Sequence, residues 1–128
     1  MQTDPKILTA PSLAYLGDAV LELLVRERLL EQGYTTSKKL NAAALRFVRA
    51  TEQAAAMERI LPLLTEEELG AFHRGRNIGH TNTPKSASVA EYRSATGMEA
   101  LFGYLHMTGE RARIRELFEY AYPKEEKR

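Results

Sequence analysis

Apolar residues recur with helical spacing along nearly the whole chain, and no segment alternates with the two-residue period of a strand. This pattern predicts an all-α fold in a single domain, with an ordered core over residues 10–122 and a charged tail over residues 123–128. Six helices are expected, over residues 11–31, 38–49, 51–61, a segment that follows Thr65, 89–107 and 110–122.

Local signals mark where several of these helices begin and end. Pro62 must stop or kink the third helix, because proline lacks an amide hydrogen and restricts the residue before it. Thr65 and Glu68 match a capping box that opens the fourth helix. Glycine, asparagine and proline gather within residues 75–87, which are therefore expected to form a loop, and Ser88 is expected to cap the helix that follows.

The first predicted helix is apolar nearly all round, which is typical of a buried helix. An ionised aspartate is almost never fully buried unless it is paired or bound to a metal. Asp18, in the middle of this helix, therefore indicates a site rather than a packing position, and Gly17 beside it permits another element to approach closely. The apolar face expected to point inward consists of Leu13, Leu16, Val20, Leu23, Leu24 and Leu30.

The predicted helix over residues 89–107 repeats this environment around a second acid, Glu99. Ala95 stands one turn before it and Gly103 one turn after it. Small residues let helix axes approach more closely than the usual ~8–10 Å. We therefore predict that the two helices cross at their glycines and that Asp18 and Glu99 share one site.

Composition and charge limit the classes of function. The formal net charge of the 128 residues is +1, so the molecule as a whole is not a general polyanion binder. The chain has no cysteine, no signal-peptide pattern at its start and no run of ~18 apolar residues, which favours a cytoplasmic protein without a membrane span, disulfides or a thiolate metal site. The charge is uneven, however, because basic residues gather in residues 38–49 and 73–93.

Two carboxylates in an apolar setting can share a proton, pair with a cation or bind a hard metal ion. Because the chain has no cysteine and only three histidines, oxygen ligation favours Mg²⁺, with Mn²⁺ as a possible substitute, over Zn²⁺. Mg²⁺ commonly takes one or two protein carboxylates when phosphates supply other ligands. A Mg²⁺ site beside basic segments indicates phosphodiester chemistry.

Two motifs carry a resemblance to a known family. Leu16-Gly17-Asp18-Ala19-Val20-Leu21-Glu22 resembles the signature of ribonuclease III catalytic domains, and Glu99-Ala100-Leu101-Phe102-Gly103 resembles the second acidic motif of that family. The short length, the absence of a double-stranded-RNA-binding domain after residue 122, and Arg74-Gly75-Arg76-Asn77 resemble the Mini-III branch. The resemblance covers about residues 10–122.

The resemblance implies a homodimeric, ribonuclease III catalytic-domain-like helical bundle that grips double-stranded RNA. Two active sites, one for each strand, are expected to leave 5′-phosphate and 3′-hydroxyl ends. In the Mini-III branch the implied substrate is a ribosomal RNA precursor of the 23S type in bacteria, and a ribosomal protein on that substrate is a candidate partner.

The family surrounds its metal site with four acids per subunit, and Asp18 and Glu99 occupy two of those positions. Ala14 and Thr96 stand at the other two, a reduction that Mini-III-like chains share. Asp18 and Glu99 are thus the predicted catalytic and metal-binding residues. Glu22 is a candidate third ligand or water-positioning group, with simple exposure as the alternative. Thr96 is a candidate to hold a water of the metal shell, or only bonds back to its own helix.

Basic residues are the candidates for contacts with RNA phosphates, because a basic, glycine-rich and almost acid-free segment can lie against a nucleic-acid backbone. Solvation of a loop is the alternative for the segment around residue 75, and a solvated face is an equal alternative for residues 38–49. His73 and His80 are expected to be surface or hydrogen-bonded residues, and Tyr15 and Phe102 core or dimer-interface groups. The predicted RNA contacts are Arg74, Arg76, Lys85, Arg93, Lys38 and Lys39.

Other interpretations of the same residues stay open at this point. Asp18 would have a structural role if it paired with an arginine, and Glu99 if it paired with Arg93. A non-catalytic, ribosome-associated RNA-binding protein with the same fold is the main alternative, although such a protein gains nothing from carboxylates that face phosphates. An all-α nucleotide pyrophosphohydrolase would need acids at Glu-x-x-Glu spacing, and the only candidate, residues 66–68, reads as a helix start.

Overall fold

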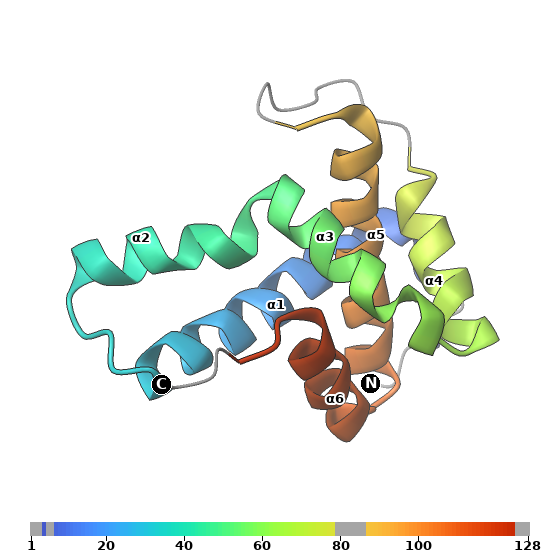
Figure 1. The fold of residues 1–128 in the computed structure, drawn as a ribbon. Coiled ribbons are helices and arrows are strands. Elements are labelled where there is room, and N and C mark those ends of the chain that lie inside the picture. Colours follow the sequence, from blue (N-terminus) through green and yellow to red (C-terminus); the bar gives the residue numbers. More distant parts are fainter. Residues whose placement is uncertain (1–3, 5–6, 79–86, 125–128) are drawn as a thin grey trace.

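The computed structural model describes residues 4, 7–78 and 87–124, and this part of the chain contains helices and no strand (Figure 1). The predicted all-α fold and its six helices are confirmed. The elements are α1 (Ala10–Glu31), α2 (Ser37–Val48), α3 (Ala50–Ile60), the short 3₁₀ turn η1 (Leu61–Leu63), α4 (Glu66–Arg76), α5 (Val89–Met107) and α6 (Arg111–Ala121).

The expected helix signals act as predicted. Thr65 and Glu68 form a complete capping box at the start of α4, and Ser88 and Glu91 form another at the start of α5. Pro62 falls in η1, so α3 ends two residues before it at Ile60.

The expected loop over residues 75–87 is wrong at its beginning. Helix α4 continues through Arg76, so Gly75 and Arg76 are helical. Gly75 serves as a packing position, because a Cβ there would lie 2.5 Å from the Cβ of Ala100 and 2.9 Å from the Cα of Gly97. Lys85 and His80 lie outside the described residues.

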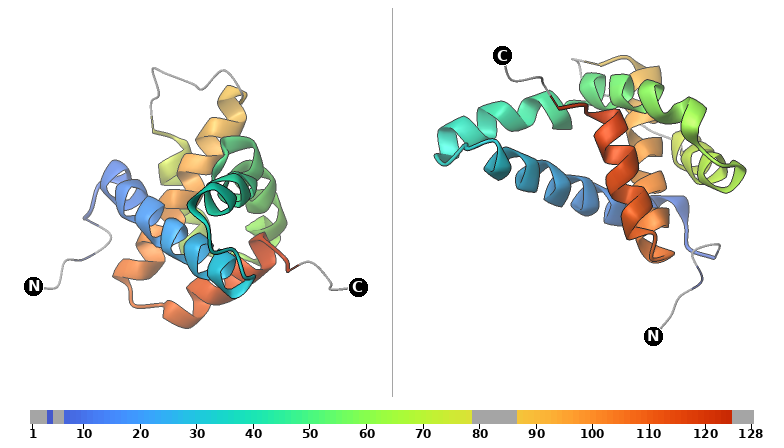
Figure 2. Two further views of the ribbon diagram at one scale, coloured as in Figure 1. Left: turned by 90° about the vertical axis from the view of Figure 1, so that its left-hand side faces the viewer. Right: turned by 60° about the horizontal axis from the view of Figure 1, so that its bottom comes forward.

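Helix α5 is the centre of the packing. It contacts α1, α3, α4 and α6. The C-terminal part of α1 and the neighbouring α2 extend to one side of this core as two adjacent arms, which Figure 1 and the right-hand view of Figure 2 both show. Within the described residues, no helix is long and apolar enough to cross a bilayer. The fully buried core side chains include Met57, Ile60, Met98, Leu101, Phe102, Leu105 and Leu117.

The apolar face predicted for α1 is partly wrong. Leu23 and Leu30 are each 61% exposed. Tyr15, expected in the core or at a dimer interface, is 85% exposed and so does not belong to the core. The reason is that α5 covers one side of α1 only, and periodicity in a helix that is apolar nearly all round does not say which side that is. On α2, the apolar spacing also predicts an inward position for Val48, which is 43% exposed. The buried positions of α1 are Leu13, Ala14, Gly17, Leu21, Leu24, Val25, Arg28 and Leu29.

Arg28 is a buried charge that the sequence did not reveal. Its guanidinium donates to the carbonyl of Tyr122, lies 3.1 Å from a carboxylate oxygen of Glu119 and stacks over the ring of Phe118. The Nε of Arg59, on α3, donates to the carbonyl of Ala121 at 2.7 Å. The two arginines therefore fix the C-terminal end of α6 against α1 and α3, which places Tyr122 beside the site described below.

Candidate active site

Helices α1 and α5 cross with their backbones in direct contact. A Cβ on Gly17 would lie 1.6 Å from the carbonyl oxygen of Glu99, and a Cβ on Gly103 would lie 2.0 Å from the carbonyl oxygen of Leu13. Only glycine, which has no side chain, permits this approach at both positions. The predicted crossing at glycines is confirmed.

The crossing brings together Asp18, from α1, and Glu99, from α5. Glu99 is half-buried and Asp18 is exposed. Burial is the largest cause that raises the pKa of Glu99, and the hydrogen bond with Asp18 and the negative charge of Asp18 add to it, so that together they bring the pKa to about 8. The hydrogen bond places the two carboxyl groups side by side.

A cavity of about 200 Å³ opens over this pair. Its far wall comes from the end of α2, from α3 and from the residue that follows α6. Sequence analysis did not identify Gln53 or Tyr122 as part of the site. For Gln53 a signal existed, because it is a polar residue on the inward side of an alanine-rich helix. The lining residues are Asp18, Leu21, Glu22, Val25, Phe47, Val48, Gln53, Glu99 and Tyr122.

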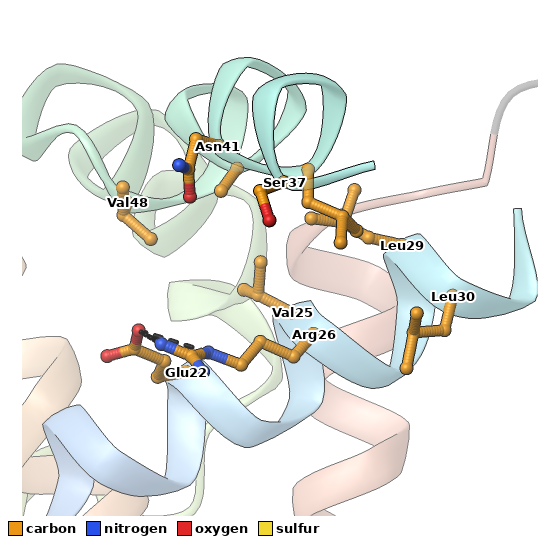
Figure 3. A pocket seen from close by; sticks show the side chains of 10 residues that line it. Glu22, Val25, Arg26, Leu29, Leu30, Ser37, Asn41 and Val48 are labelled. Carbon is orange, nitrogen blue, oxygen red and sulfur yellow. Dashed lines mark hydrogen bonds and ion pairs between the residues drawn. The ribbon is translucent and has the colours of Figure 1, made fainter. Parts of the chain in front are cut away.

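Glu22 lies at the rim of this cavity. Its Oε1 is 2.6 Å from the Nη2 of Arg26, and both side chains are exposed. It also lines a larger groove of about 410 Å³ between α1 and α2, where Val48 and Asn41 stand across from it (Figure 3). Glu22 thus lies near the carboxyl pair but is already paired with Arg26. Its exposure agrees with the expected alternative of a simply exposed side chain.

Thr96 and Ala14, at the two positions where the family has further acids, do not line the cavity. The hydroxyl of Thr96 donates to the carbonyl of Tyr92 at 3.1 Å, within α5. Ala14 packs in a small apolar cluster with Leu13 and Ala100. Thr96 therefore bonds back to its own helix, which was one of its two expected roles.

The basic residues expected to contact RNA do not form one patch. Arg74 and Arg76 lie on α4, where Arg74 donates to the carbonyl of Leu8 and Arg76 lies over the ring of Phe72. Arg93 is exposed in the second turn of α5. Lys38 and Lys39 are exposed in the first turn of α2, at the outer end of the arm in Figure 1. A ligand that touched both groups would have to extend along the molecule.

The donor set fits a hard divalent cation. No group of three or more histidine, aspartate or glutamate side chains in the described ranges is arranged to hold a metal ion. Mg²⁺ does not need such a cage, because it commonly binds one or two carboxylates and keeps several waters. Burial and the neighbouring charge of Asp18 disfavour the ionised form of Glu99, and a cation held by the two carboxyl groups would offset both effects.

The sequence that builds this site matches a known protein family. The family model described as Ribonuclease III domain matches residues 11–110, which include both carboxyl groups and the glycine crossing. The chain belongs to the ribonuclease III family. The resemblance expected from the two motifs is therefore confirmed.

Relatives within this family extend the similarity to nearly the whole chain. Mini-ribonuclease 3 of Symbiobacterium thermophilum is 48% identical over 92% of this chain and 91% of its own length. Mini-ribonuclease 3 of Desulfitobacterium hafniense is 49% identical over 88% of this chain and 71% of its own length. A crystal structure of a protein from Fusobacterium nucleatum, 28% identical, superposes with a TM-score of 0.86 and covers 95% of this chain and 100% of that one. This ribonuclease III-family chain is thus similar over most of its length to the Mini-ribonuclease 3 proteins.

The metal-free domain is expected to lose stability as the pH rises. The folded-state pKa of Glu99, about 8, lies above its ordinary value of 4.5, so its contribution is complete below about pH 4.5 and is lost as the pH rises through 8. Each pKa unit corresponds to about 1.4 kcal/mol, and partial solvent access reduces the total to about 1–3 kcal/mol. Urea unfolding in EDTA at pH 5 and pH 8.5 measures this change.

Glu99→Gln is the matched variant for this measurement, since it keeps the shape of the side chain and cannot ionise. Its free energy of unfolding should vary less with pH than that of the wild type, and it should be the more stable of the two at pH 8.5. If the free energy of unfolding depended on pH in the same way in both proteins, the raised pKa of Glu99 would be contradicted.

Proposed function

We propose that this domain is a Mg²⁺-dependent endoribonuclease that cleaves double-stranded RNA and leaves 5′-phosphate and 3′-hydroxyl ends. The observation that carries the proposal is the pairing of Asp18 with Glu99 in one cavity at the glycine crossing of α1 and α5. Membership of the ribonuclease III family supports the class of reaction. Mn²⁺, which prefers similar oxygen ligands, is a plausible substitute for Mg²⁺.

Asp18 and Glu99 would hold the ion, directly or through water. The ion supplies a coordinated water of lowered pKa and positive charge beside the scissile phosphate. Glu99 would serve as a ligand in its ionised form, so the proton that its raised pKa favours would compete with the ion, and the exposed Asp18 would supply the second carboxylate. Exposed basic side chains on α2, α4 and α5 would contact phosphates on either side of the cut and set the register of the duplex.

The proposed substrate in the cell is a ribosomal RNA precursor of the 23S type, with a ribosomal protein on that RNA as a candidate partner. This part rests on the Mini-III resemblance. The similarity to Mini-ribonuclease 3 proteins, over 92% and 93% of this chain for two of them, supports it.

The domain is proposed to act as a homodimer, since a cut in both strands requires two sites. Helix α1 offers a surface for this contact next to Asp18. Tyr15 and Leu23 project from it into solvent, and Ala19 lies between them on the same side. Large apolar side chains grouped on an exposed face commonly mark a protein–protein interface.

Tyr15→Arg is expected to convert the dimer into a monomer, because a charge buried at such a contact has no partner there. Tyr120→Arg is the matched control, because Tyr120 is 57% exposed on a different helix, α6. Light scattering after size-exclusion chromatography distinguishes the two masses. A dimeric Tyr15→Arg protein would place the interface elsewhere.

The decisive experiment is incubation of the purified chain with long double-stranded RNA in Mg²⁺ and in EDTA. The single strands of the same RNA, tested separately, are the control for duplex specificity. We expect short duplex products only with Mg²⁺ and only from the duplex, with ends that phosphatase and ligase treatment identify as 5′-phosphate and 3′-hydroxyl. Binding of the duplex without any cleavage in Mg²⁺ or Mn²⁺ would support the non-catalytic RNA-binding alternative instead.

A further inference from the structure

Gln53 is out of place in the part of α3 that faces the core. The buried residues of this helix are Gln53, Ala54, Ala56, Met57 and Ile60, of which only Gln53 is polar. It is 9% exposed. Burial of a carboxamide costs free energy unless a hydrogen bond compensates for the lost water, so packing alone favours an apolar residue here.

No protein group compensates for that burial. The backbone N–H of Gln53 donates to the carbonyl of Arg49, the N-cap residue of α3, at 2.8 Å. Within the part of the chain that the structure describes, the side chain of Gln53 has no hydrogen-bond partner. In these residues, the fully buried side-chain atoms that lack a hydrogen-bond partner belong to Arg28 and His73 and not to Gln53. The carboxamide of Gln53 therefore reaches open space, and the cavity over Asp18 and Glu99 is the space that it lines.

This position supplies what the site otherwise lacks. Ala14 packs in a small apolar cluster, Thr96 bonds within its own helix, and Glu22 is paired with Arg26. Gln53 comes from a third helix and offers a neutral oxygen acceptor and two N–H donors to the same cavity that the carboxyl pair lines. Groups that hydrogen-bond the ligands and waters of a metal ion strongly influence its affinity.

We propose that Gln53 is a positioning residue of this site, whose carboxamide holds a water molecule of the metal ion's hydration shell against Asp18 and Glu99. The inference rests on the proposed function, because it needs a metal ion at the carboxyl pair. It adds a contribution from α3 to a site that the two motifs place on α1 and α5 alone.

The test measures binding of Mn²⁺ to the RNA-free, full-length protein by the electron paramagnetic resonance signal of the free ion. Gln53→Leu removes both hydrogen-bonding groups, and Gln53→Met does so with nearly the same side-chain length. We expect the dissociation constant for Mn²⁺ to rise about tenfold in both variants. Gln53→Glu keeps an oxygen that accepts hydrogen bonds and adds a negative charge, so it should bind Mn²⁺ at least as tightly as the wild type.

Two controls separate this role from a structural one. Gln32→Leu removes a carboxamide from an exposed position at the end of α1, and its Mn²⁺ affinity should equal that of the wild type. The midpoint of thermal unfolding should stay equal or rise in Gln53→Met, because an apolar residue suits the rest of the α3 face. If Gln53→Leu does not fold, Gln53→Met alone decides the question.

The outcomes are distinguishable from failure of the proposed function. Wild-type Mn²⁺ affinity in folded Gln53→Met, together with duplex cleavage by the wild type, would overturn the role of Gln53 and leave the nuclease proposal standing. If the wild type neither binds Mn²⁺ nor cleaves duplex RNA, both proposals fall together.

Discussion

Asp18→Asn is expected to lower the rate of double-stranded RNA cleavage by about a thousandfold or more, with the fold and the dimer unchanged. An asparagine offers one neutral oxygen where the wild type offers a full negative charge. The site would therefore lose one of the two carboxylates that are proposed to hold the metal ion. A loss of about 4 kcal/mol of transition-state stabilisation corresponds to a factor of about a thousand in rate. The measurement is the initial rate of duplex cleavage in saturating Mg²⁺.

The fold should survive because Asp18 is exposed and supports no core contact. Its replacement also removes the negative charge that helps raise the pKa of Glu99, so the metal-free variant should be no less stable than the wild type. Glu27→Gln is the matched control, because it removes a carboxylate from the same helix at a position that faces Arg115 rather than the cavity. Near wild-type cleavage by Asp18→Asn would remove the basis for the proposed mechanism.

Short-range signals predicted much of this structure. The limits of α5 agree with the prediction at both ends, because Ser88 and Glu91 cap its beginning and Gly109, at φ +75°, ends the turn that follows it. The contact of α1 with α5 was also predictable. Packing does not explain an acid in an apolar helix close to a glycine, and this combination occurs in both helices. Local composition alone therefore indicated one shared site.

Features that depend on distant partners were not predictable. Arg28 is buried because Glu119 and Tyr122, more than eighty residues further along the chain, surround it. The exposure of Tyr15 and Leu23 depends on which side of α1 the other helices leave uncovered. The composition of residues 75–87 predicts a loop, yet Gly75 lies inside α4, where its lack of a side chain lets α4 pack against α5. Apolar periodicity gives the presence of a helix but not the neighbours of each face.

Gly17→Ala is expected to destabilise the domain by about 3 kcal/mol or more. The added Cβ would lie 1.6 Å from the carbonyl oxygen and 2.5 Å from the carbonyl carbon of Glu99. These are backbone atoms in the middle of α5, so relief requires the two helices to separate, and forced overpacking of this kind commonly costs ~1–3 kcal/mol or more. Urea unfolding at fixed pH measures the change.

Gly70→Ala is the matched control, because a Cβ at this exposed position in α4 meets nothing within 4 Å. Alanine has the higher helix propensity, so this variant should be more stable than the wild type by up to about 1 kcal/mol. Wild-type stability in Gly17→Ala would mean that the backbones do not touch as described. Because the clash falls on the residue that carries the second carboxyl group, Gly17→Ala should lose stability and cleavage together. Asp18→Asn should lose cleavage alone, and this difference separates the packing role of the crossing from its chemical role.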